Sequence, residues 1–490
     1  MKYDVIIVGS GAGGCASAWQ LACRGVRVLL VERGPRLARD GSTLDTDTVF
    51  RRKAFLADER WNDASGAGFV PQERFNLGGK TKWYGAALMR FDPREFDADP
   101  DHACPGWPIS YAEIQPWYEL AEHLLGVRRF EIEPDLARIV TGLRAADSAW
   151  TSVPLGMGLS SRILEHLEEA THFDGFASPR GLKSDGEVSL LDSVRANPNI
   201  SIVVDKRVTD LLADADPLRV SGVLCEDGTR YVGDRVLLAA GALHSPQLLE
   251  RYVARHGLAG RLPGTSRIGR AYKSHLLTAL LAFSPRRQRD LLRKTAALFH
   301  DAFPHSSAQP LGFLDGPLLA PELPAWTPRP VAAALAARAY GFFLQTEDGS
   351  HADNRVRTGT TPGDPPVLDY DPKRQPGALA EHRRFVRKLA AGLLRMGFAT
   401  VTKPIPLSGT AHACGTLAAG HDPSSSVVDS AGRVHGTENL YVVDGSALPR
   451  IGRVNPALTI YAWSLRVSSH LVEQGEQHGD RIARRNQVRA

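Results

Sequence analysis

Three glycines near the N-terminus have the spacing of a dinucleotide-binding loop. Gly9, Gly11 and Gly14 fit the pattern GxGxxG, and Glu32 follows 18 residues after the last of them. In such a loop the first glycine permits a tight turn, the second lets the backbone approach a pyrophosphate, and the third lets helix and strand pack closely. The acidic residue stands where a carboxylate accepts hydrogen bonds from ribose hydroxyls. The spacing therefore predicts a nucleotide site at these four residues.

The residues around these glycines have the pattern of a βαβ unit. Residues 4–8 are a short apolar run, typical of a strand that is buried on both faces. Small residues and Leu21 continue as a helix as far as Gly25, and a second strand is expected over residues 26–31. The helix would present free N–H groups and its positive dipole end to phosphates. The pattern does not separate NAD from FAD, and a βαβ unit without a ligand is the alternative.

A second informative stretch lies near the other end of the chain. Residues 440–443 are a buried strand by composition, and Asp444 stands in the turn at its end. Asn455 followed by Pro456 predicts an N-cap with proline at the first helical position. A carboxylate such as Asp444 suits a hydroxyl-rich chain such as ribityl. A helix that begins at Asn455 would direct the positive end of its dipole at any negative charge that lies before it.

This region resembles the glucose–methanol–choline (GMC) family of flavin oxidoreductases. The family's motifs occur in the family's order at residues 412–429 (HACGTLAAGHDPSSSVVD), 433–449 (RVHGTENLYVVDGSALP) and 454–460 (VNPALTI). Three more stretches agree, at residues 76–81 (NLGGKT), 239–249 (AAGALHSPQLL) and 268–275 (IGRAYKSH). The resemblance therefore extends over essentially the whole chain.

The resemblance implies that the chain binds FAD. Some relatives attach FAD covalently through a histidine near the glycine-pair loop, but residues 78–88 contain no histidine, so we expect FAD to be bound non-covalently. The expected cofactor-binding residues lie in the first βαβ unit, the glycine-pair loop, the middle of the chain and the C-terminal motifs. They are Gly9, Gly11, Ala12, Gly14, Glu32, Arg33, Gly78, Gly79, Thr81, Val208, Ala240, Gly241, Asp444, Gly445, Asn455, Pro456 and Thr459.

The same resemblance assigns the chemistry to a histidine and an asparagine. Removing a hydride from a carbinol carbon requires loss of the hydroxyl proton at about the same time, and a neutral imidazole near pH 7 suits that step. By resemblance His412 is this base, Asn455 fixes the substrate oxygen, and the hydride goes to flavin N5. His275 suits a packing role or a flavin contact equally. Cys414 suits a small buried residue better than a nucleophile, and His435 is expected to be structural.

An alcohol is the expected substrate, in particular a sugar, polyol or glycoside, because residues 106–111 (GWPISY) resemble the sugar- and polyol-oxidising branch of the family. Oxygen or a redox carrier would take the electrons. Two other classes are open: a lyase of the same fold that keeps FAD only as a scaffold, and a nicotinamide dehydrogenase built on the N-terminal unit. The second leaves the motifs of residues 408–470 unexplained.

The fold class implied is α/β, with a Rossmann-like FAD-binding domain interleaved with a substrate domain built on an antiparallel sheet with helices. Strands are expected over residues 340–370, and alternation places Gln345 and Glu347 on one face as candidate substrate contacts. The proline-rich residues 285–330 suit a lid or a spacer. The expected FAD domain comprises residues 1–100, 185–275 and 408–471, the substrate domain 101–184 and 276–407, and a polar, disordered tail 472–490.

Composition excludes several other classes of protein. The chain has 490 residues, of which 43% are hydrophobic and 23% charged, as in ordinary globular proteins. The last ten residues carry four arginines and no acidic residue, so most of the net charge of +5 lies there and no nucleic-acid-binding surface is expected. The five cysteines are scattered, which predicts neither a disulfide framework nor a metal site. With no leader and no long apolar run, the chain is expected to be cytoplasmic.

Overall fold

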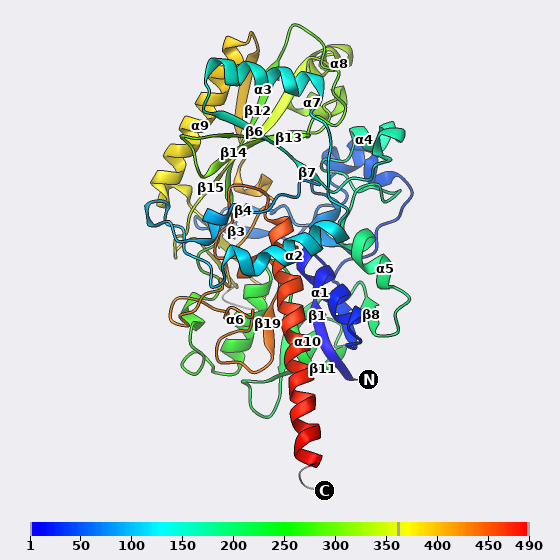
Figure 1. Ribbon diagram of the computed structural model, residues 1–490, viewed down its shortest axis with the longest axis vertical. Coiled ribbons are helices and arrows are strands. Elements are labelled where there is room, and N and C mark those ends of the chain that lie inside the picture. Colours follow the sequence, from blue (N-terminus) through cyan, green and yellow to red (C-terminus); the bar gives the residue numbers. More distant parts are fainter. Residues whose placement is uncertain (1, 360–362, 488–490) are drawn as a thin grey trace.

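The computed structural model describes residues 2–359 and 363–487, with side chains up to residue 473. A mixed sheet lies in the lower half of Figure 1 and an antiparallel sheet in the upper half. The predicted α/β class is confirmed. Elements from both ends of the sequence meet in the lower half, where the N-terminal β1 and α1 lie beside the C-terminal α10.

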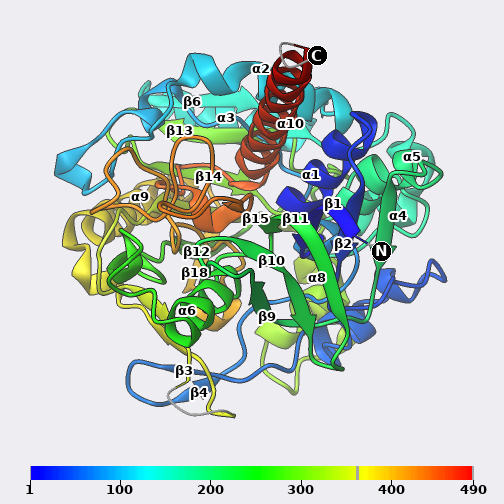
Figure 2. The same cartoon turned by 90° about the horizontal axis from the view of Figure 1, so that it is seen from below.

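The mixed sheet has the strand order β8-β2-β1-β11-β10-β9, and β19 pairs with β11. Strands β8, β2, β1, β11 and β19 are parallel neighbours, while β9 and β10 form an antiparallel extension. All four residues of β2 and the last four of β1 are buried, as expected for strands covered on both faces. Figure 2 shows this sheet from below. The strands are β1 (Lys2–Val8), β2 (Val28–Val31), β8 (Ile200–Val203), β9 (Val208–Ala213), β10 (Val220–Cys225), β11 (Arg230–Leu238) and β19 (Leu440–Val442).

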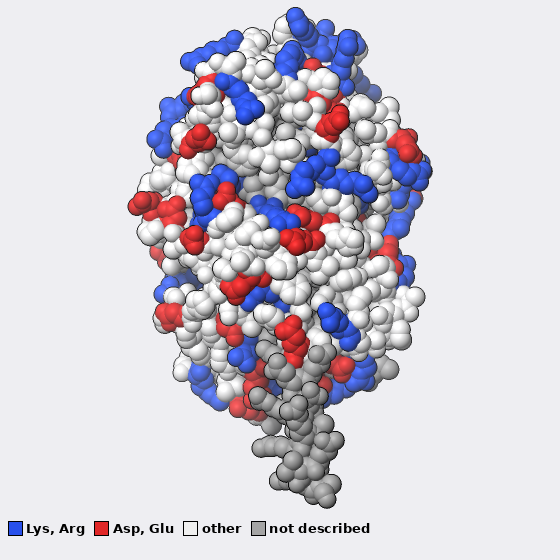
Figure 3. All heavy atoms as spheres, viewed as in Figure 1, with Lys and Arg blue, Asp and Glu red and all other residues white. Residues whose placement is uncertain are grey.

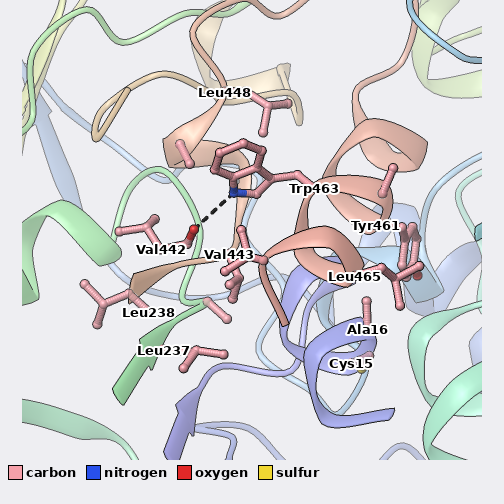
Figure 4. Close-up of a cluster of buried hydrophobic side chains, with 14 of the residues drawn as sticks. Cys15, Ala16, Leu237, Leu238, Val442, Val443, Leu448, Tyr461, Trp463 and Leu465 are labelled. Atoms are coloured by element: carbon pink, nitrogen blue, oxygen red, sulfur yellow. Dashed lines mark hydrogen bonds between the residues drawn. The ribbon is translucent and has the colours of Figure 1, made fainter. Parts of the chain in front are cut away.

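Helices α1 (Ala12–Cys23) and α10 (Ala457–Gln487) pack against each other beside this sheet. Ser464 Oγ donates to the carbonyl oxygen of Gly13 at 2.5 Å. Trp463 and Leu465 of α10 belong to one buried cluster with apolar side chains of β11, β19 and α1, and the Trp463 indole N–H donates to the Val442 carbonyl at 3.1 Å (Figure 4). This buried cluster fixes the loop after β1 relative to the loop after β19, so residues from opposite ends of the chain can form one site.

Helix α10 differs from the prediction at both ends. It begins at Ala457, so Pro456 precedes the first helical residue instead of occupying that position. It also continues to Gln487, whereas the sequence predicts a disordered tail from residue 472. The helix therefore extends well past the apolar residues on which the sequence prediction of its end depends. Residues 488–490 of the predicted tail lie outside the described residues.

The antiparallel sheet has the order β18-β12-β15-β14-β13-β6. One face packs on α3 (Pro134–Ala146) and α9 (Pro376–Arg395) around a core that includes Leu280, Phe342 and Phe385. The other face is turned toward the middle of the molecule. The strands are β6 (Trp150–Pro154), β12 (His275–Phe283), β13 (Ala296–His300), β14 (Ser306–Pro310), β15 (Ala339–Glu347) and β18 (Ala399–Pro404).

Two small sheets and the remaining helices connect these layers. A four-stranded sheet has the order β16-β17-β3-β4, and β5 pairs with β7. Helix α2 packs on α10. The elements are α2 (Tyr111–Leu124), α4 (Leu167–Thr171), α5 (Asp192–Val194), α6 (Ser245–Arg255), α7 (Gly316–Leu319), α8 (Arg329–Ala336), β3 (Trp61–Asp63), β4 (Gly68–Phe69), β5 (Arg128–Arg129), β7 (Gly156–Met157), β16 (Arg355–Arg357) and β17 (Val367–Asp369).

The proline-rich residues 285–330 form more than a lid or spacer, because they contribute β13 and β14 to the antiparallel sheet before they reach α7. The basic run 286–294 of this segment forms no helix or strand. The Glu133 carboxylate accepts backbone N–H bonds from Leu291 and Leu292, at 2.7 and 3.1 Å, in place of helical carbonyl acceptors.

Acidic and basic side chains are intermixed on the face of the molecule shown in Figure 3. Among the helices of the described residues, none combines the length and the apolar character needed to cross a membrane. The strands of the mixed sheet all come from the segments predicted as the FAD domain. Apart from β12, whose first residue is His275, those of the antiparallel sheet come from the predicted substrate domain. The domain limits themselves stay a prediction.

Candidate active site

A cavity of about 2250 Å³ is bordered by the loop after β1, by one face of the antiparallel sheet and by the residues around α7 and α8. Most of the predicted site residues line it, although they come from every part of the chain. These lining residues are Gly9, Gly11, Ala12, Glu32, Arg33, Gly79, Thr81, Val208, Ala240, Gly241, Gln345, His412, Asp444, Gly445, Asn455 and Pro456. Gly14, Gly78, Glu347 and Thr459 are not among the residues that line this cavity.

Two different physical constraints explain the glycines of the loop after β1. A Cβ atom on Gly9 would come within 2.5 Å of the Ala239 carbonyl oxygen, and one on Gly14 would collide with the Gly9 carbonyl oxygen. Packing therefore requires both residues, in keeping with the predicted turn and helix–strand contact. A Cβ atom on Gly11 would meet no atom within 4 Å, and Gly11 lines the cavity. The protein itself does not need glycine at residue 11, whereas a ligand that approaches the backbone would.

The N-terminus of α1 opens onto the same part of the cavity. Gly11 is its N-cap residue, and no side chain caps the first turn. The first N–H groups of the helix thus have no side-chain acceptor, and the helix dipole adds positive potential there. This arrangement suits a pyrophosphate.

Glu32, at the end of β2, is held by the loop that precedes α1. Its carboxylate accepts hydrogen bonds from the Ser10 N–H at 3.0 Å, the Ser10 hydroxyl at 2.5 Å and the Gly34 N–H at 2.9 Å. Burial raises the pKa of Glu32, while these hydrogen bonds oppose that rise. The side chain lines the cavity in a fixed orientation, as a group that accepts ribose hydroxyls must.

The glycine-pair loop lies directly against the loop after β1. The Gly78 N–H donates to the Ser10 hydroxyl at 3.0 Å, and a Cβ atom on Gly79 would come within 3.2 Å of the Gly11 Cα. The Thr81 hydroxyl donates to the Gly78 carbonyl at 2.5 Å and closes the turn. Gly78 therefore shapes the loop from behind, while Gly79 and Thr81 line the cavity.

Asp444 joins the middle of the chain to the C-terminal motifs. Its carboxylate accepts from the Gly241 N–H at 2.8 Å, from the Ser245 hydroxyl at 2.5 Å and from the Ser446 N–H at 2.8 Å. Burial raises the pKa of this carboxyl group, and the hydrogen bonds lower it. The residue lines the cavity next to Gly445 and the start of α10.

His412 and Asn455 are brought together, although they are 43 positions apart in the sequence. Asn455 Nδ2 lies 3.4 Å from His412 Nε2, and Asn455 Oδ1 accepts a hydrogen bond from the Gln309 side-chain amide. The prediction that Asn455 caps the helix is therefore wrong. Its side chain bonds to His412 and Gln309, and the helix begins at Ala457. His412, Gln309 and Asn455 all line the cavity.

A chain of hydrogen bonds fixes which nitrogen of His412 carries the proton. His275 Nε2 lies 2.8 Å from the Gly452 carbonyl oxygen, which can only accept, so Nε2 of His275 is protonated. Burial lowers the pKa of His275 to about 4, so the ring is neutral and its Nδ1 is an acceptor. His275 Nδ1 and His412 Nδ1 are 2.8 Å apart, so His412 must donate from Nδ1. The Nε2 atom of neutral His412 is then an unprotonated acceptor beside Asn455.

His412 is also kept neutral. Burial, followed by the nearby His275, Lys80 and Lys294, lowers its pKa well below the ordinary value of 6.5. The two lysines are themselves ion-paired, with Glu73 at 2.8 Å and Asp174 at 2.9 Å. At neutral pH the imidazole is therefore ready to accept a proton at Nε2.

Gln345 and Glu347 do share one face of β15, but the structure separates their roles. Gln345 lines the cavity and donates to the Arg453 carbonyl at 3.0 Å. Glu347 is 1% exposed, and both its oxygens accept hydrogen bonds from Arg450, at 3.0 and 2.7 Å. This buried ion pair keeps Glu347 away from the cavity, so the structure does not support it as a substrate contact.

Thr459 also lies away from the cavity, within the first turn of α10. It is fully buried, and its hydroxyl is 2.7 Å from the Tyr118 hydroxyl of α2. The residue thus joins α10 to α2. Its side chain does not reach the cavity, so the structure does not support the predicted cofactor contact.

The Cys414 thiol and a cluster of three possible metal ligands need no catalytic role to explain them. Burial raises the pKa of the Cys414 thiol to about 12, as expected for a small buried residue and not for a nucleophile. Among the described residues, Cys104, His305 and Glu347 are close enough to share a metal ion. The guanidinium of Arg450 already occupies both Glu347 oxygens, so we assign no metal there.

Sequence reasoning missed Gln309 and left the role of His275 open. Gln309 lies on β14 in a segment without a recognisable motif, and only its contact with Asn455 identifies it. His275 matches a family position, but its place in the proton chain depends on the Gly452 carbonyl, which no residue type records.

This chain is similar to known protein families and to named enzymes. A sequence model described as GMC oxidoreductase matches residues 350–464, and one described as FAD dependent oxidoreductase matches residues 4–157. The 6'''-hydroxyparomomycin C oxidase of Streptomyces lividus is 30% identical over 97% of this chain and 93% of its own length. The chain belongs to the GMC family. It is an FAD-dependent oxidoreductase that acts on CH–OH groups, which excludes the nicotinamide alternative.

Another relative and a solved structure extend the comparison. The paromamine 6'-oxidase of Streptomyces fradiae is also 30% identical, over 97% of this chain and 93% of its own length. The solved structure of pyridoxine 4-oxidase from Mesorbium loti has a TM-score of 0.70 and 20% identity, and it covers 96% of this chain and 99% of that one. At that identity the likeness concerns the fold alone.

The residues of this GMC chain fit FAD. Gly11 leaves open space above an uncapped helix N-terminus, where a pyrophosphate needs it. Glu32 and Asp444 place two oriented carboxylates on the cavity wall, suited to ribose and ribityl hydroxyls. Around Gly11, Glu32 and Asp444 the cavity therefore has the hydrogen-bond donors and acceptors that FAD requires.

Proposed function

We propose that this protein oxidises a CH–OH group of a sugar, polyol or glycoside to a carbonyl, with His412 as the base. FAD, when bound, supplies the hydride acceptor at flavin N5. The single observation that carries the assignment is the hydrogen-bond chain from Gly452 through His275, which leaves Nε2 of His412 unprotonated toward the cavity. Two relatives named as oxidases of sugar-containing compounds support the substrate class.

In this proposal each side chain has one task. His412 accepts the hydroxyl proton at Nε2. Asn455 orients the same oxygen through its amide, which the Gln309 amide holds in place. Helix α10 begins just after Asn455, so its positive end faces the cavity and favours negative charge there.

Flavin absorbance is the direct test of the proposed function. Purified holoenzyme is mixed anaerobically with a panel of sugars, polyols, glycosides and simple alcohols, and any bleached sample is then exposed to air. Bleaching by one class identifies the substrate, and fast recolouring identifies oxygen as the acceptor while slow recolouring indicates a redox carrier. A flavin that no sugar, polyol or glycoside bleaches would contradict the proposed substrate class.

The proton chain predicts a specific effect at His275, which acts only through His412. We expect His275→Leu to slow flavin reduction by about 10- to 100-fold, because His412 loses the acceptor that fixes its tautomer. His275→Asn keeps an acceptor near Nδ1, so we expect it to restore most of the rate. FAD content and melting temperature are measured in both variants, and equal loss in both would mean that the role of His275 is only structural.

The lowered pKa of His412 predicts the pH dependence. Since burial disfavours the imidazolium, the active neutral base persists below the ordinary histidine value and is lost only as pH falls through the lowered pKa. We therefore expect the rate of flavin reduction at saturating substrate to be flat between about pH 6.5 and about pH 8. Stopped-flow measurements across this range test the prediction, and an inflection near pH 7 would contradict it.

A further inference from the structure

The face of the antiparallel sheet that borders the cavity is mostly apolar. Along β12 the side chains alternate: Thr278, Leu280 and Ala282 are buried on the side of α3 and α9. The residues between them are partly exposed and line the cavity, namely Leu277, Ala279, Leu281 and Phe283. No helix covers this face in the described residues, so its apolar side chains are free to contact a ligand.

Strand register extends this apolar surface across the sheet. Ala279 is opposite Phe343 on β15, and Leu281 is opposite Val401 on β18. Leu281 is also opposite Gly341, where the missing side chain leaves room for Leu311 to lie close to the sheet. We call Leu277, Ala279, Leu281, Phe283, Leu311, Phe343 and Val401 the apolar strip.

The strip has a polar end and an apolar end. Leu277 is opposite Gln345, and Gln309 is opposite Phe343, so both amides stand at the end nearest Asn455 and His412. Six residues further along β12, about 20 Å away, Phe283 stands at the other end. A ligand whose hydroxyl reaches His412 therefore has an extended apolar surface beside the rest of its length.

The opposite wall has the same character. The segment after β14 lines the cavity with Leu314, Leu318, Leu319 and Leu323, and α8 adds Ala332 and Ala333. Gly316 lets this segment pack closely on α8, because a Cβ atom there would lie 3.2 Å from the Ala333 Cα. In Figure 1, α7 and α8 lie at the same end of the molecule as β12 and β13. The strip and this wall thus enclose a mostly apolar space.

Both lysines that line these walls are ion-paired with a carboxylate. Lys403 lines the cavity from β18 and is 2.7 Å from Glu322. Lys294 is 2.9 Å from Asp174. Arg329, at the exposed start of α8, also lines the cavity, and no ion pair is formed by it in the described residues. One unpaired arginine is little free charge for a polycationic or polyanionic ligand at the strip.

We propose that the substrate joins a polar, hydroxyl-bearing head to an apolar body, as an alkyl or aryl glycoside does, and that the apolar strip binds this body. The proposal rests on the proposed function and selects, among sugars, polyols and glycosides, those with a hydrophobic aglycone. The head meets Gln309, Gln345, Asn455 and His412, and the body displaces water from the strip.

Two series of alcohols test this inference, alkyl β-D-glucosides from methyl to octyl and 1-alkanols from ethanol to octanol, all below micelle-forming concentrations. Anaerobic stopped-flow bleaching separates apparent Kd from the limiting rate of flavin reduction. Calorimetric titration of the His412→Ala holoenzyme measures binding without turnover. In at least one series we expect each added methylene to lower Kd by about two- to fourfold. A Kd independent of chain length in both series, or preference for free sugars, would overturn the inference.

Variants locate the effect on the strip. Leu281→Asn and Phe343→Asn should each weaken octyl glucoside or octanol binding by about tenfold or more and flatten the dependence on chain length. Leu394→Asn is the matched control, because Leu394 lies on α9, is 56% exposed and is not a cavity residue. Equal effects in control and strip variants would contradict the inference. Tail-dependent binding without any bleaching would support the strip and count against the proposed oxidation.

Discussion

His412→Ala yields a folded protein that retains FAD but reduces it with substrate about 100- to 10,000-fold more slowly. The size of the loss is that of a general base removed from a proton transfer. The structure explains why no neighbour replaces the imidazole: His275 faces it with Nδ1 but uses its only proton on the Gly452 carbonyl, and Asn455 has no basic nitrogen. Anaerobic bleaching of the purified variant measures the effect.

His435→Ala is the matched control for this experiment. His435 bonds to the Ser426 hydroxyl at 3.0 Å and is not among the residues that line the cavity. We expect the control to reduce flavin at close to the wild-type rate. If His412→Ala behaved like the control while both retained FAD, His412 would not be the base.

Local patterns predicted much of the site, because the groups concerned interact within short segments. The run of residues 4–8, the glycines after it and Glu32 each have one structural solution, and the structure has β1, the loop and the end of β2 there. The meeting of His412 with Asn455 was available only from the family resemblance. Neither residue type nor spacing indicates that positions 43 apart lie within hydrogen-bond distance.

The wrong predictions for Glu347 and Thr459 share a physical cause. Strand and helix periodicity predicts which residues share a face, but not which residues of other elements that face contacts. Alternation places Gln345 and Glu347 on one face of β15, yet the buried Arg450 captures Glu347 and leaves Gln345 to the cavity. Likewise Thr459 lies in the expected helix, but its hydroxyl meets Tyr118 from α2. Both outcomes depend on partners from distant parts of the chain.

Strand periodicity also does not predict that the apolar strip faces a cavity. Leu277, Leu281 and Phe283 have the alternation of any half-buried strand, for which a packed core is the ordinary expectation. Only the tertiary structure shows that α3 and α9 cover one face and that the cavity lies along the other. Substrate preference is therefore the property of this protein that the sequence motifs record least.

Gly11→Val yields a folded protein that is purified without FAD. The backbone of Gly11 has φ −68° and ψ −165°, an extended conformation that valine adopts readily, and a Cβ atom there meets no atom within 4 Å. The new side chain therefore strains nothing in the protein, yet it fills the space through which a pyrophosphate reaches the N-terminus of α1.

The prediction separates folding from cofactor binding more cleanly than substitution of Gly9 or Gly14, where a side chain collides with backbone. The visible absorbance of the purified variant, FAD titration and melting temperature are the measurements. Gly260→Val is the control, because Gly260 also has open space around its Cβ position but is exposed and is not a cavity residue. We expect the control to be yellow and fully loaded. A Gly11→Val protein that is equally yellow would refute the pyrophosphate site, because the added side chain fills the open space above the Gly11 backbone that this site requires.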